Sequence, residues 1–369
     1  MAGARPRVLV ITPDFPPAKG GIQILSHRAV SSFTTLEPTV ATVGHPDAAS
    51  FDRTQAYRIE RSRDWPGKNR WSNFALNAAA IGLALRERPD VVLSTHIVAS
   101  PAAVLLRRHL GIPFVQYVYA KELGVRPNLA RFAGMRADRV LAVSRYTHEL
   151  LVALGVPGGR VTVINPGVDV PAEAPTDRPP GGRPTVLTIA RLEDRYKGHD
   201  VILRALPLVR AEVPDVRWRV VGGGPLRATL EDRVQALGLA KAVQFLGSVS
   251  NEARDEELAH ADVFCMVSRL PAAGFAGEGF GIVYLEANAY GLPVVAGGVG
   301  GATDAVVHGE TGLLVDPQDH VAVADALVTL LRDRDLAGRL ARGGRERAHR
   351  FTWEAMGARV ESELLSVIR

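Results

Sequence analysis

Short runs of Val, Ile and Leu recur along the chain, separated by stretches whose apolar residues follow helical spacing. The runs lack polar alternation, as expected of strands buried on both faces. Repeated strand–helix order predicts an α/β fold with a doubly wound parallel sheet. In the first half the strand candidates are Val8–Ile11, Thr39–Val43, Val91–Ser94, Phe114–Val118, Val140–Val143 and Val161–Ile164, with helical patterns at Ile22–Phe33, Trp71–Arg86 and Arg145–Leu154.

The alternation stops once and then resumes. Residues 171–184 read PAEAPTDRPPGGRP, a composition typical of a linker. We therefore predict a first domain at 1–172, a linker at 173–184 and a second domain at 185–352, with ligands in a cleft between the domains. The later strand candidates are Thr185–Ile189, Val216–Val221, Val243–Phe245, Val263–Val267, Pro293–Ala296 and Leu313–Val315, followed by helical patterns at His320–Arg332 and Trp353–Ile368.

Composition narrows the class of protein. Of the 369 residues, 47% are hydrophobic and 22% charged, which excludes a disordered chain, a collagen and a coiled coil. The single cysteine, Cys265, excludes an intramolecular disulfide and a cysteine-based zinc site. The first apolar run is too short for a signal peptide and no run approaches the ~20 residues of a membrane span, so we expect a cytoplasmic protein. The net charge of +5 favours anionic partners, either phosphates or a membrane surface.

Two features of the first domain follow predicted strands. Gly20 and Gly21 stand between the first strand and the helix at Ile22, where glycine permits close approach of a ligand and the helix offers free N–H groups to an anion. His96 ends the strand at Val91–Ser94, where an imidazole can bind a sugar hydroxyl or move a proton. A plain turn and a structural histidine explain these residues equally well.

Two loops of the second domain suit a phosphate ligand. Arg191 and Lys197 follow its first strand, and an Arg fork with a Lys point charge fits a diphosphate. Because the acids Glu193 and Asp194 lie in the same loop, the alternative that it is only a solvated charged loop remains. The loop from Gly222 through Gly224 to Pro225 lets a ligand lie against bare backbone, but its spacing is not that of a nicotinamide dehydrogenase.

Residues 278–293, EGFGIVYLEANAYGLP, carry the strongest signal: a glycine-rich loop, a helix start and a Gly-Leu-Pro stop. The N–H groups of Gly281 to Val283 are expected to point at a phosphate. Glu278 lies in the loop on the sugar side. Glu286, about two turns into the predicted helix, is placed to accept two hydroxyl hydrogens of a ribose.

These motifs, in this order, resemble the retaining glycosyltransferases of family 4, whose GT-B fold has two Rossmann-like domains facing a cleft. The Pro-Pro-x-x-Gly-Gly loop, the Arg191/Lys197 pair and the Glu278/Glu286 pair carry the resemblance, which covers nearly the full chain. It continues through LPVVA at 292–296, Gly300-Gly301 and GETGLLV at 309–315.

The resemblance implies roles for the candidate residues. Arg191 and Lys197 neutralise the donor diphosphate, Glu278 contacts the transferred sugar, and His96 touches that sugar near the reacting centre. No metal and no cofactor are expected, since the two cations stand where a divalent ion would. The donor-binding residues implied are Gly20, Gly21, Gly222, Gly224, Phe280, Gly281, Ile282, Val283 and Glu286.

The resemblance also implies the reaction. We expect a retaining, metal-independent transfer of a hexose from a UDP- or GDP-sugar to a hydroxyl acceptor, a glycolipid or a small natural product, with attack on the face that the phosphate leaves. A sugar-nucleotide epimerase or hydrolase of the same fold, and a catalytically silent nucleotide-binding relative, are the alternatives. Nucleic-acid binding is disfavoured because acids interleave with the basic residues.

Two further expectations concern membranes and the C-terminus. The first-domain loop resembles that of bacterial mannosyltransferases acting on phosphatidylinositol mannosides. The segment Arg58–Trp71, RIERSRDWPGKNRW, either rests on anionic lipid at the inner face of the membrane or forms a solvated loop. The last helix, at 353–369, is expected to pack back on the first domain, with one apolar face made of Met356, Val360, Leu364, Leu365 and Ile368.

Overall fold

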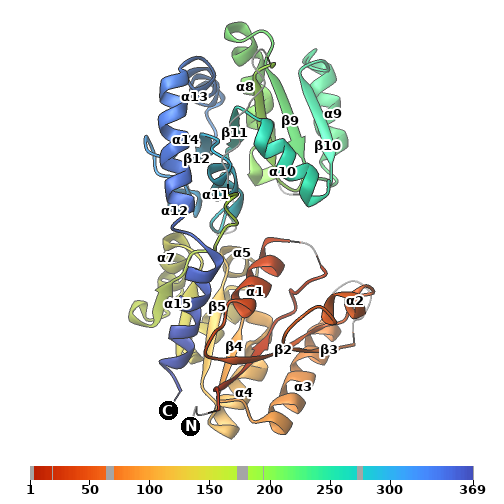
Figure 1. The fold of residues 1–369 in the computed structure, drawn as a ribbon, viewed down its shortest axis with the longest axis vertical. Coiled ribbons are helices and arrows are strands. Elements are labelled where there is room, and N and C mark those ends of the chain that lie inside the picture. Colours follow the sequence, from red (N-terminus) through yellow and green to blue (C-terminus); the bar gives the residue numbers. More distant parts are fainter. Residues whose placement is uncertain are drawn as a thin grey trace. The chain divides into compact units, whose positions relative to one another are not determined.

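The computed structural model describes residues 4–18, 20–63, 70–172, 182–193, 195–271 and 277–368. The chain forms two compact units, Met1–Gly167 with Trp353–Arg369, and Val168–Thr352 (Figure 1). Most of the predicted linker, residues 173–181, lies outside the described part. Within that part, no helix has the length and apolar character required to cross a bilayer.

The first unit is built on a parallel seven-stranded sheet of order β3-β2-β1-β4-β5-β6-β7. Its strands are β1 (Arg7–Ile11), β2 (Glu37–Val43), β3 (Arg58–Ser62), β4 (Val91–Ser94), β5 (Phe114–Val118), β6 (Arg139–Ala142) and β7 (Val161–Val163). Its helices are α1 (Gly21–Ser31), α2 (Ala48–Asp52), α3 (Arg70–Glu87), α4 (Ser100–Leu110), α5 (Ala120–Val125), α6 (Pro127–Arg136), α7 (Arg145–Ala153) and α15 (Trp353–Leu365), with 3-10 turns η1 (Ile97–Ala99) and η2 (Gly158–Arg160).

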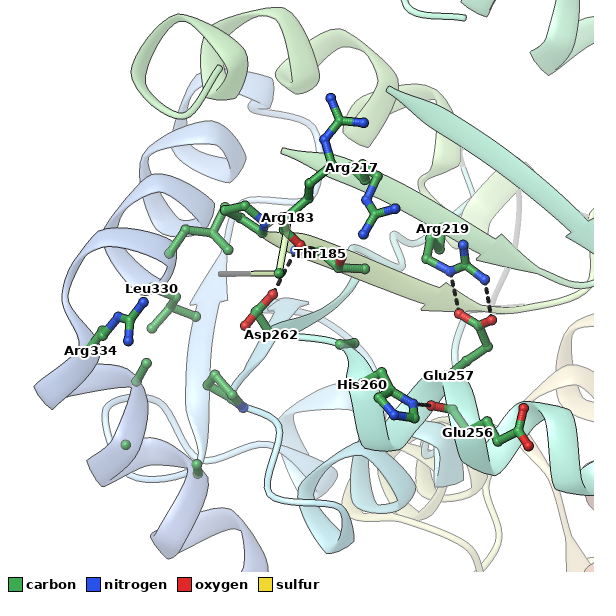
Figure 2. A pocket seen from close by; sticks show the side chains of 18 residues that line it. Arg183, Thr185, Arg217, Arg219, Glu256, Glu257, His260, Asp262, Leu330 and Arg334 are labelled. Atoms are coloured by element: carbon green, nitrogen blue, oxygen red, sulfur yellow. Dashed lines mark hydrogen bonds and ion pairs between the residues drawn. The ribbon is translucent and has the colours of Figure 1, made fainter. Parts of the chain in front are cut away.

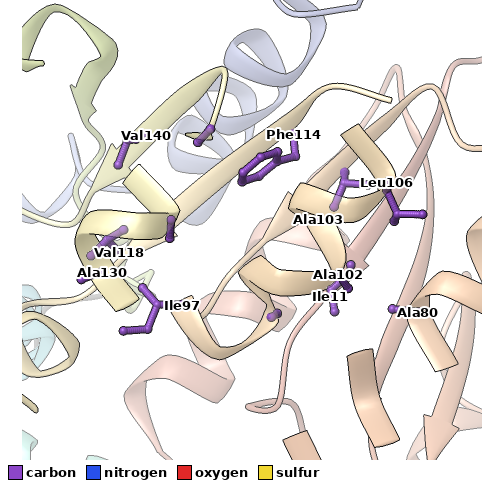
Figure 3. Close-up of a cluster of buried hydrophobic side chains, with 14 of the residues drawn as sticks. Ile11, Ala80, Ile97, Ala102, Ala103, Leu106, Phe114, Val118, Ala130 and Val140 are labelled. Carbon is purple, nitrogen blue, oxygen red and sulfur yellow. The ribbon is translucent and has the colours of Figure 1, made fainter. Parts of the chain in front are cut away.

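Alanines on the helices allow close packing against this sheet. Ala102 and Ala103 of α4 and Ala80 of α3 are fully buried in one cluster with strand residues such as Ile11 and Phe114 (Figure 3). The strands β4 and β5 are buried along their whole length, as the absence of polar alternation predicts.

The second unit repeats the plan with a parallel six-stranded sheet of order β10-β9-β8-β11-β12-β13. Its strands are β8 (Thr185–Ile189), β9 (Arg217–Val221), β10 (Val243–Gly247), β11 (Val263–Met266), β12 (Val294–Gly297) and β13 (Gly312–Val315). Its helices are α8 (His199–Glu212), α9 (Arg227–Ala236), α10 (Asn251–His260), α11 (Ile282–Ala289), α12 (Ala302–Ala305), α13 (His320–Arg332) and α14 (Arg334–Ala348), with the 3-10 turn η3 (Arg195–Lys197). The two Rossmann-like sheets predicted from the apolar runs are confirmed.

The sequence analysis did not predict one strand of the first unit. The charged segment RIERS forms β3 at the sheet edge, where Arg58 pairs with Glu87 and Arg61 pairs with Asp52 at 2.7 Å. Taking Arg58–Trp71 as one surface loop was therefore wrong for its first part, and α3 already begins at Arg70. Residues 64–69 lie outside the described part.

The boundary between the units lies earlier than the predicted residue 172. Val168 is buried in the second unit's core, and its N–H donates to the Phe351 carbonyl at 2.7 Å. Arg345 of α14 donates to the Pro171 carbonyl at 2.6 Å. These bonds fix residues 168–172 to the second unit, although their sequence reads as the end of the first.

The helix α15 belongs to the first unit and packs beside α1 (Figure 1). Met356, Val360 and Leu364 are buried, but Leu365 is 37% exposed and the helix ends before Ile368, so its apolar face is narrower than predicted.

A carboxylate of α15 ties the helix to the loop after α1. Glu361 Oε1 accepts the N–H groups of Thr34, Thr35 and Leu36 at 2.7–3.0 Å, and Oε2 accepts the Thr34 hydroxyl. Burial raises the pKa of Glu361, but the hydrogen bonds from Thr35 and Leu36 lower it by more, so the net shift is downward.

We expect Glu361→Gln to destabilise the first unit by about 1–3 kcal/mol at pH 7, because three backbone N–H groups, including the buried one of Leu36, lose a charged acceptor. A depressed pKa contributes stability above the unfolded value of about 4.3, and this contribution is lost as the pH falls through the lower folded value. Urea unfolding at pH 7 and at pH 3 measures both effects. The control is Glu363→Gln, since Glu363 makes only a 3.6 Å surface pair with Arg139. Equal stability of the two variants at pH 7 would contradict the prediction.

Candidate functional site

The candidate residues of the second unit gather at the carboxyl edge of its sheet. β8 pairs with β9 on one side and with β11 on the other. The loops after β8 and β11 therefore leave the sheet side by side, at the point where the strand order reverses. Lys197 comes from the first of these loops and Glu278 from the second.

Lys197 and Glu278 form an ion pair although they stand far apart in the sequence. The Lys197 Nζ lies 2.5 Å from Glu278 Oε2, and the two side chains are only 16% and 12% exposed. The hydroxyl of Ser268 donates to the same carboxylate oxygen at 3.4 Å. Burial lowers the pKa of Lys197, but the Glu278 carboxylate and Tyr196 together raise it by more, so the net shift is upward.

Arg191 does not join this pair. Its side chain is 65% exposed and bonds Glu193 at 3.0 Å, the neighbour that made a solvated loop plausible from the sequence. Asp194 lies outside the described residues. The structure therefore brings together one of the two expected cations with the expected sugar-binding acid.

The loop at Gly222–Pro225 has a structural reason for its glycines. A Cβ on Gly222 would collide with the Ala190 carbonyl, and one on Gly224 would collide with the Leu192 carbonyl. The N–H of Leu192 donates to the Gly223 carbonyl at 2.8 Å. These glycines hold the loop that carries Arg191 by close backbone packing, whether or not they also face a ligand.

The helix α11 begins where the sequence predicts. Gly281, its N-cap, has φ 87°, and a Cβ there would strike the ring of Tyr284. The first N–H groups of a helix, here those of Ile282 and Val283, have no acceptor within it and are open to an anion. Phe280 is 3% exposed and lies against Phe351, so only its backbone can face a ligand.

Glu286 lies one turn into α11, not two, because the helix starts at Ile282. Its carboxylate accepts a 3.2 Å bond from Arg254 of α10. Burial raises the pKa of Glu286, and the Arg254 charge offsets part of that rise. The acid expected to bind a ribose thus has an internal cation as its partner.

In the first unit, the carboxyl ends of β1 and β4 meet in the same way, since the two strands pair directly. Asp14 follows β1 and accepts a 2.8 Å bond from Gln23. Gly20, the N-cap of α1, has φ 154°, and a Cβ there would strike the Gln23 side chain, while Gly21 is the first helical residue. Lys19 lies outside the described residues.

His96 follows β4 and stands between two carboxylates. Its Nδ1 lies 2.9 Å from Glu122 Oε1 and its Nε2 lies 3.9 Å from Asp14 Oδ2. Burial lowers the pKa of His96, but the charge and hydrogen bond of Glu122, helped by Asp14, raise it above its usual value. The ring lines a pocket of about 300 Å³ within the first unit, which also includes Asn73, Lys121 and Arg126.

A larger pocket of about 790 Å³ lies at the opposite, amino-terminal edge of the second sheet (Figure 2). Thr185 and Arg217, the first residues of β8 and β9, line it. Three of its charged groups have partners within the protein, since Arg219 bonds Glu257 and Asp262 accepts the Thr185 N–H at 2.8 Å. None of the sequence-predicted site residues lies there.

The sequence analysis missed Glu122, Arg254 and the part played by Asp14. Arg254 stands in NEARDEELAH, whose charges read as a solvated helix face, and Glu122 follows an unremarkable Ala-Lys. The only available signal was position, because Asp14 and Glu122 both follow predicted buried strands.

Comparison with known proteins gives consistent matches along the chain. A family model described as Glycosyltransferase Family 4 matches residues 19–171, and one described as Glycosyl transferases group 1 matches residues 171–347. The GDP-mannose-dependent alpha-(1-6)-phosphatidylinositol monomannoside mannosyltransferase of Mycolicibacterium smegmatis is 35% identical over 97% of this chain and 98% of its own.

A second relative and a solved structure also match nearly the whole chain. The GDP-mannose-dependent monoacylated alpha-(1-6)-phosphatidylinositol monomannoside mannosyltransferase of Corynebacterium glutamicum is 30% identical, over 98% of each chain. The crystal structure of Anabaena HepE in complex with UDP and glucose superposes with a TM-score of 0.79 at 20% identity, over 98% of this chain and 100% of its own.

The Lys197–Glu278 pair makes a prediction for stability. Lys197→Met leaves a mostly buried carboxylate without its cation and should destabilise the second unit by about 3 kcal/mol. The double variant Lys197→Met/Glu278→Gln should recover much of this loss, because no uncompensated charge remains. Denaturant unfolding of the three proteins measures it, and a double variant no more stable than Lys197→Met would contradict the pairing.

Proposed function

The chain belongs to glycosyltransferase family 4 and is a GT-B-type glycosyltransferase, and we propose that it transfers mannose from GDP-mannose to a phosphatidylinositol mannoside with retention and without a metal ion. The donor and acceptor are suggested by the names of the two curated relatives, one 35% and one 30% identical over nearly the whole chain. The observation that carries the proposal is the Lys197–Glu278 pair, which lies in the loops next to the start of α11.

This pair suits a nucleotide sugar because each member has a new partner when the donor binds. The diphosphate competes for the Lys197 ammonium, and Glu278 is released to accept hydroxyl hydrogens of the sugar. In the free protein the two charges neutralise each other, so no bare charge is buried. The ion pair holds both side chains in position before the donor arrives.

Negative charge grows on the leaving phosphate in the transition state. Lys197, the exposed guanidinium of Arg191 and the first N–H groups of α11 are the donors that stabilise it in our proposal. Together they supply the charge stabilisation for which other enzymes use a divalent ion. With no covalent nucleophile assigned, the acceptor hydroxyl attacks on the face that the phosphate leaves and gives its proton to that phosphate.

The remaining donor contacts in this proposal come from Glu286, His96 and the glycine loops. Glu286, with Arg254 beside it, binds the ribose hydroxyls through a carboxylate that the Arg254 charge helps to keep ionised. Gly20 and Gly21, at the start of α1, face the diphosphate, and His96 faces the transferred sugar. The glycine loop at Gly222–Gly224 supports the strand end that carries Arg191.

The pocket beside His96 suits an anionic lipid headgroup. Lys121 and Arg126 are exposed at its lining, and Ser72 and Asn73 of α3 lie on its wall. The same helix exposes Trp71 by 55% and Phe74 by 69%, one turn apart. We propose that these rings enter the lipid interface while the inositol headgroup reaches the pocket, so that the enzyme works at the inner membrane surface.

The donor proposal predicts a selective response to nucleotides. GDP should raise the melting temperature of the purified protein more than UDP, ADP or TDP does. With labelled GDP-mannose and phosphatidylinositol mannoside, the label should pass to the lipid with an α linkage, and EDTA should leave the rate unchanged. Label released only into water would favour the hydrolase alternative, transfer from UDP-glucose alone would overturn the donor, and loss of activity in EDTA restored by Mg²⁺ would overturn metal independence.

The lipid proposal predicts a measurable membrane affinity. Phe74→Ala should weaken binding to vesicles containing phosphatidylinositol on the order of tenfold, because a large exposed ring loses its apolar burial in lipid. Leu105→Ala on α4 is the matched control, since Leu105 is a 45% exposed apolar side chain outside the pocket. Vesicle sedimentation measures both, and equal binding of the two variants would contradict the proposed surface.

A further inference from the structure

The buried carboxylate of Glu122 makes three contacts, one of them to His96. Its Oε1 accepts the Ile97 N–H at 2.8 Å and lies 2.9 Å from His96 Nδ1. Its Oε2 accepts the Tyr119 N–H at 2.9 Å, at the start of α5. The side chain is only 4% exposed, so these donors take the place of water around the carboxylate.

The Nδ1 atom of His96 has two neighbours, and they require opposite protonation states of this nitrogen. The Val98 N–H points at Nδ1 from 3.2 Å, and it would need an unprotonated nitrogen. The carboxylate at 2.9 Å needs a protonated one, because an ionised acid can only accept. A charge-assisted bond is the stronger of the two, so the proton belongs on Nδ1 and the ring presents Nε2 to the pocket.

Among the described residues, four charged groups act on the ring or share its pocket. Glu122 comes from α5, Asp14 from the loop after β1, and Arg126 from the start of α6, while Lys121 lines the same pocket. The two carboxylates lie on opposite sides of the imidazole, at Nδ1 and at Nε2. Arg126 lowers the pKa of His96 but is outweighed by the two acids.

We propose that Glu122 is a positioning residue: it fixes the proton of His96 on Nδ1, holds the ring as an imidazolium and so presents a donating Nε2–H to the substrate in the pocket. The role of His96 in transfer rests on the function proposed above. The state of its ring does not, because both contacts exist in the protein without substrate.

The competing explanation is purely structural. Glu122 accepts two backbone N–H groups and would be needed for folding even if His96 had no role. Glu361 supplies a matched control, since it is a second buried carboxylate in the same unit that accepts backbone N–H groups, and in the described part of the chain it bonds no histidine. A structural role predicts the same kinetic consequences for both residues, and the positioning role does not.

The first test uses the protein without substrate. Nitrogen-15 NMR of histidine-labelled protein, with the His96 signals assigned by His96→Gln, reports which ring nitrogen carries the proton and at what pH the ring titrates. In the wild type, we expect a proton on Nδ1 and a titration midpoint above 6.5. In Glu122→Gln the midpoint should move to lower pH, and in Glu361→Gln it should stay. A wild-type ring protonated only on Nε2, or a midpoint unchanged in Glu122→Gln, would overturn the proposal.

The second test follows transfer from GDP-mannose against pH. An imidazolium donor is lost as the pH rises through the His96 pKa, so the alkaline limb of kcat should move to lower pH in Glu122→Gln. At pH 8 the loss should be about tenfold in kcat, with the donor KM changed by less than about twofold. Glu361→Gln should keep the wild-type limb. A loss that is the same at every pH would make Glu122 merely structural.

Two safeguards keep the outcomes distinct. If Glu122→Gln does not fold, Glu122→Asp is used instead, because it keeps a carboxylate but places it farther from His96 Nδ1. The titration midpoint of His96 should then lie between the wild-type value and 6.5. A midpoint equal to that of the wild type would overturn the proposal. If the wild type transfers no mannose while its ring shows the expected proton and midpoint, the proposed function fails and the Glu122 assignment stands.

Discussion

Parallel pairing of β1 with β4, and of β8 with β11, is the constraint on which the rest of this protein depends. Because the paired strands of each sheet run parallel, the loops that follow them leave at the same carboxyl edge. The sheet order reverses between these strands, so two loops from distant parts of the chain leave the edge together. Lys197 meets Glu278 in the second unit, and Asp14 approaches His96 in the first, for this one topological reason.

The charged candidates share a second property: each has an internal partner of opposite charge. Lys197 has Glu278, Glu286 has Arg254, and His96 has Glu122. Isolated charges in such half-buried places would be costly, so pairing is what allows them to be held ready. A nucleotide sugar brings its own charges and hydroxyls, and its binding is therefore an exchange of partners. This explains how a protein without bound ligand can keep a polar site ordered.

The apolar runs alone were sufficient to predict the two sheets, because strands buried on both faces consist almost entirely of apolar residues. β5 and β8 begin and end where the sequence predicts. The prediction failed at two places that lack a run of apolar residues. The edge strand β3 carries ion pairs of Arg58 and Arg61. Residues 168–172 join the second unit through the buried side chain of Val168 and through hydrogen bonds such as that from Arg345. Neither cause leaves a periodic trace.

The sequence by itself determined the fold class, the family and the residues Lys197, Glu278, Glu286 and His96 as candidates, because glycine loops and strand ends are local features. Only the tertiary structure decided which of them meet. It joined Lys197 to Glu278 while leaving Arg191 with its neighbour Glu193, and it brought Glu122 and Arg254 to the candidates from helices whose sequences look ordinary. The physical reason is that a side chain's proton and charge are set by groups within a few ångströms, and sheet order, not sequence distance, selects those groups.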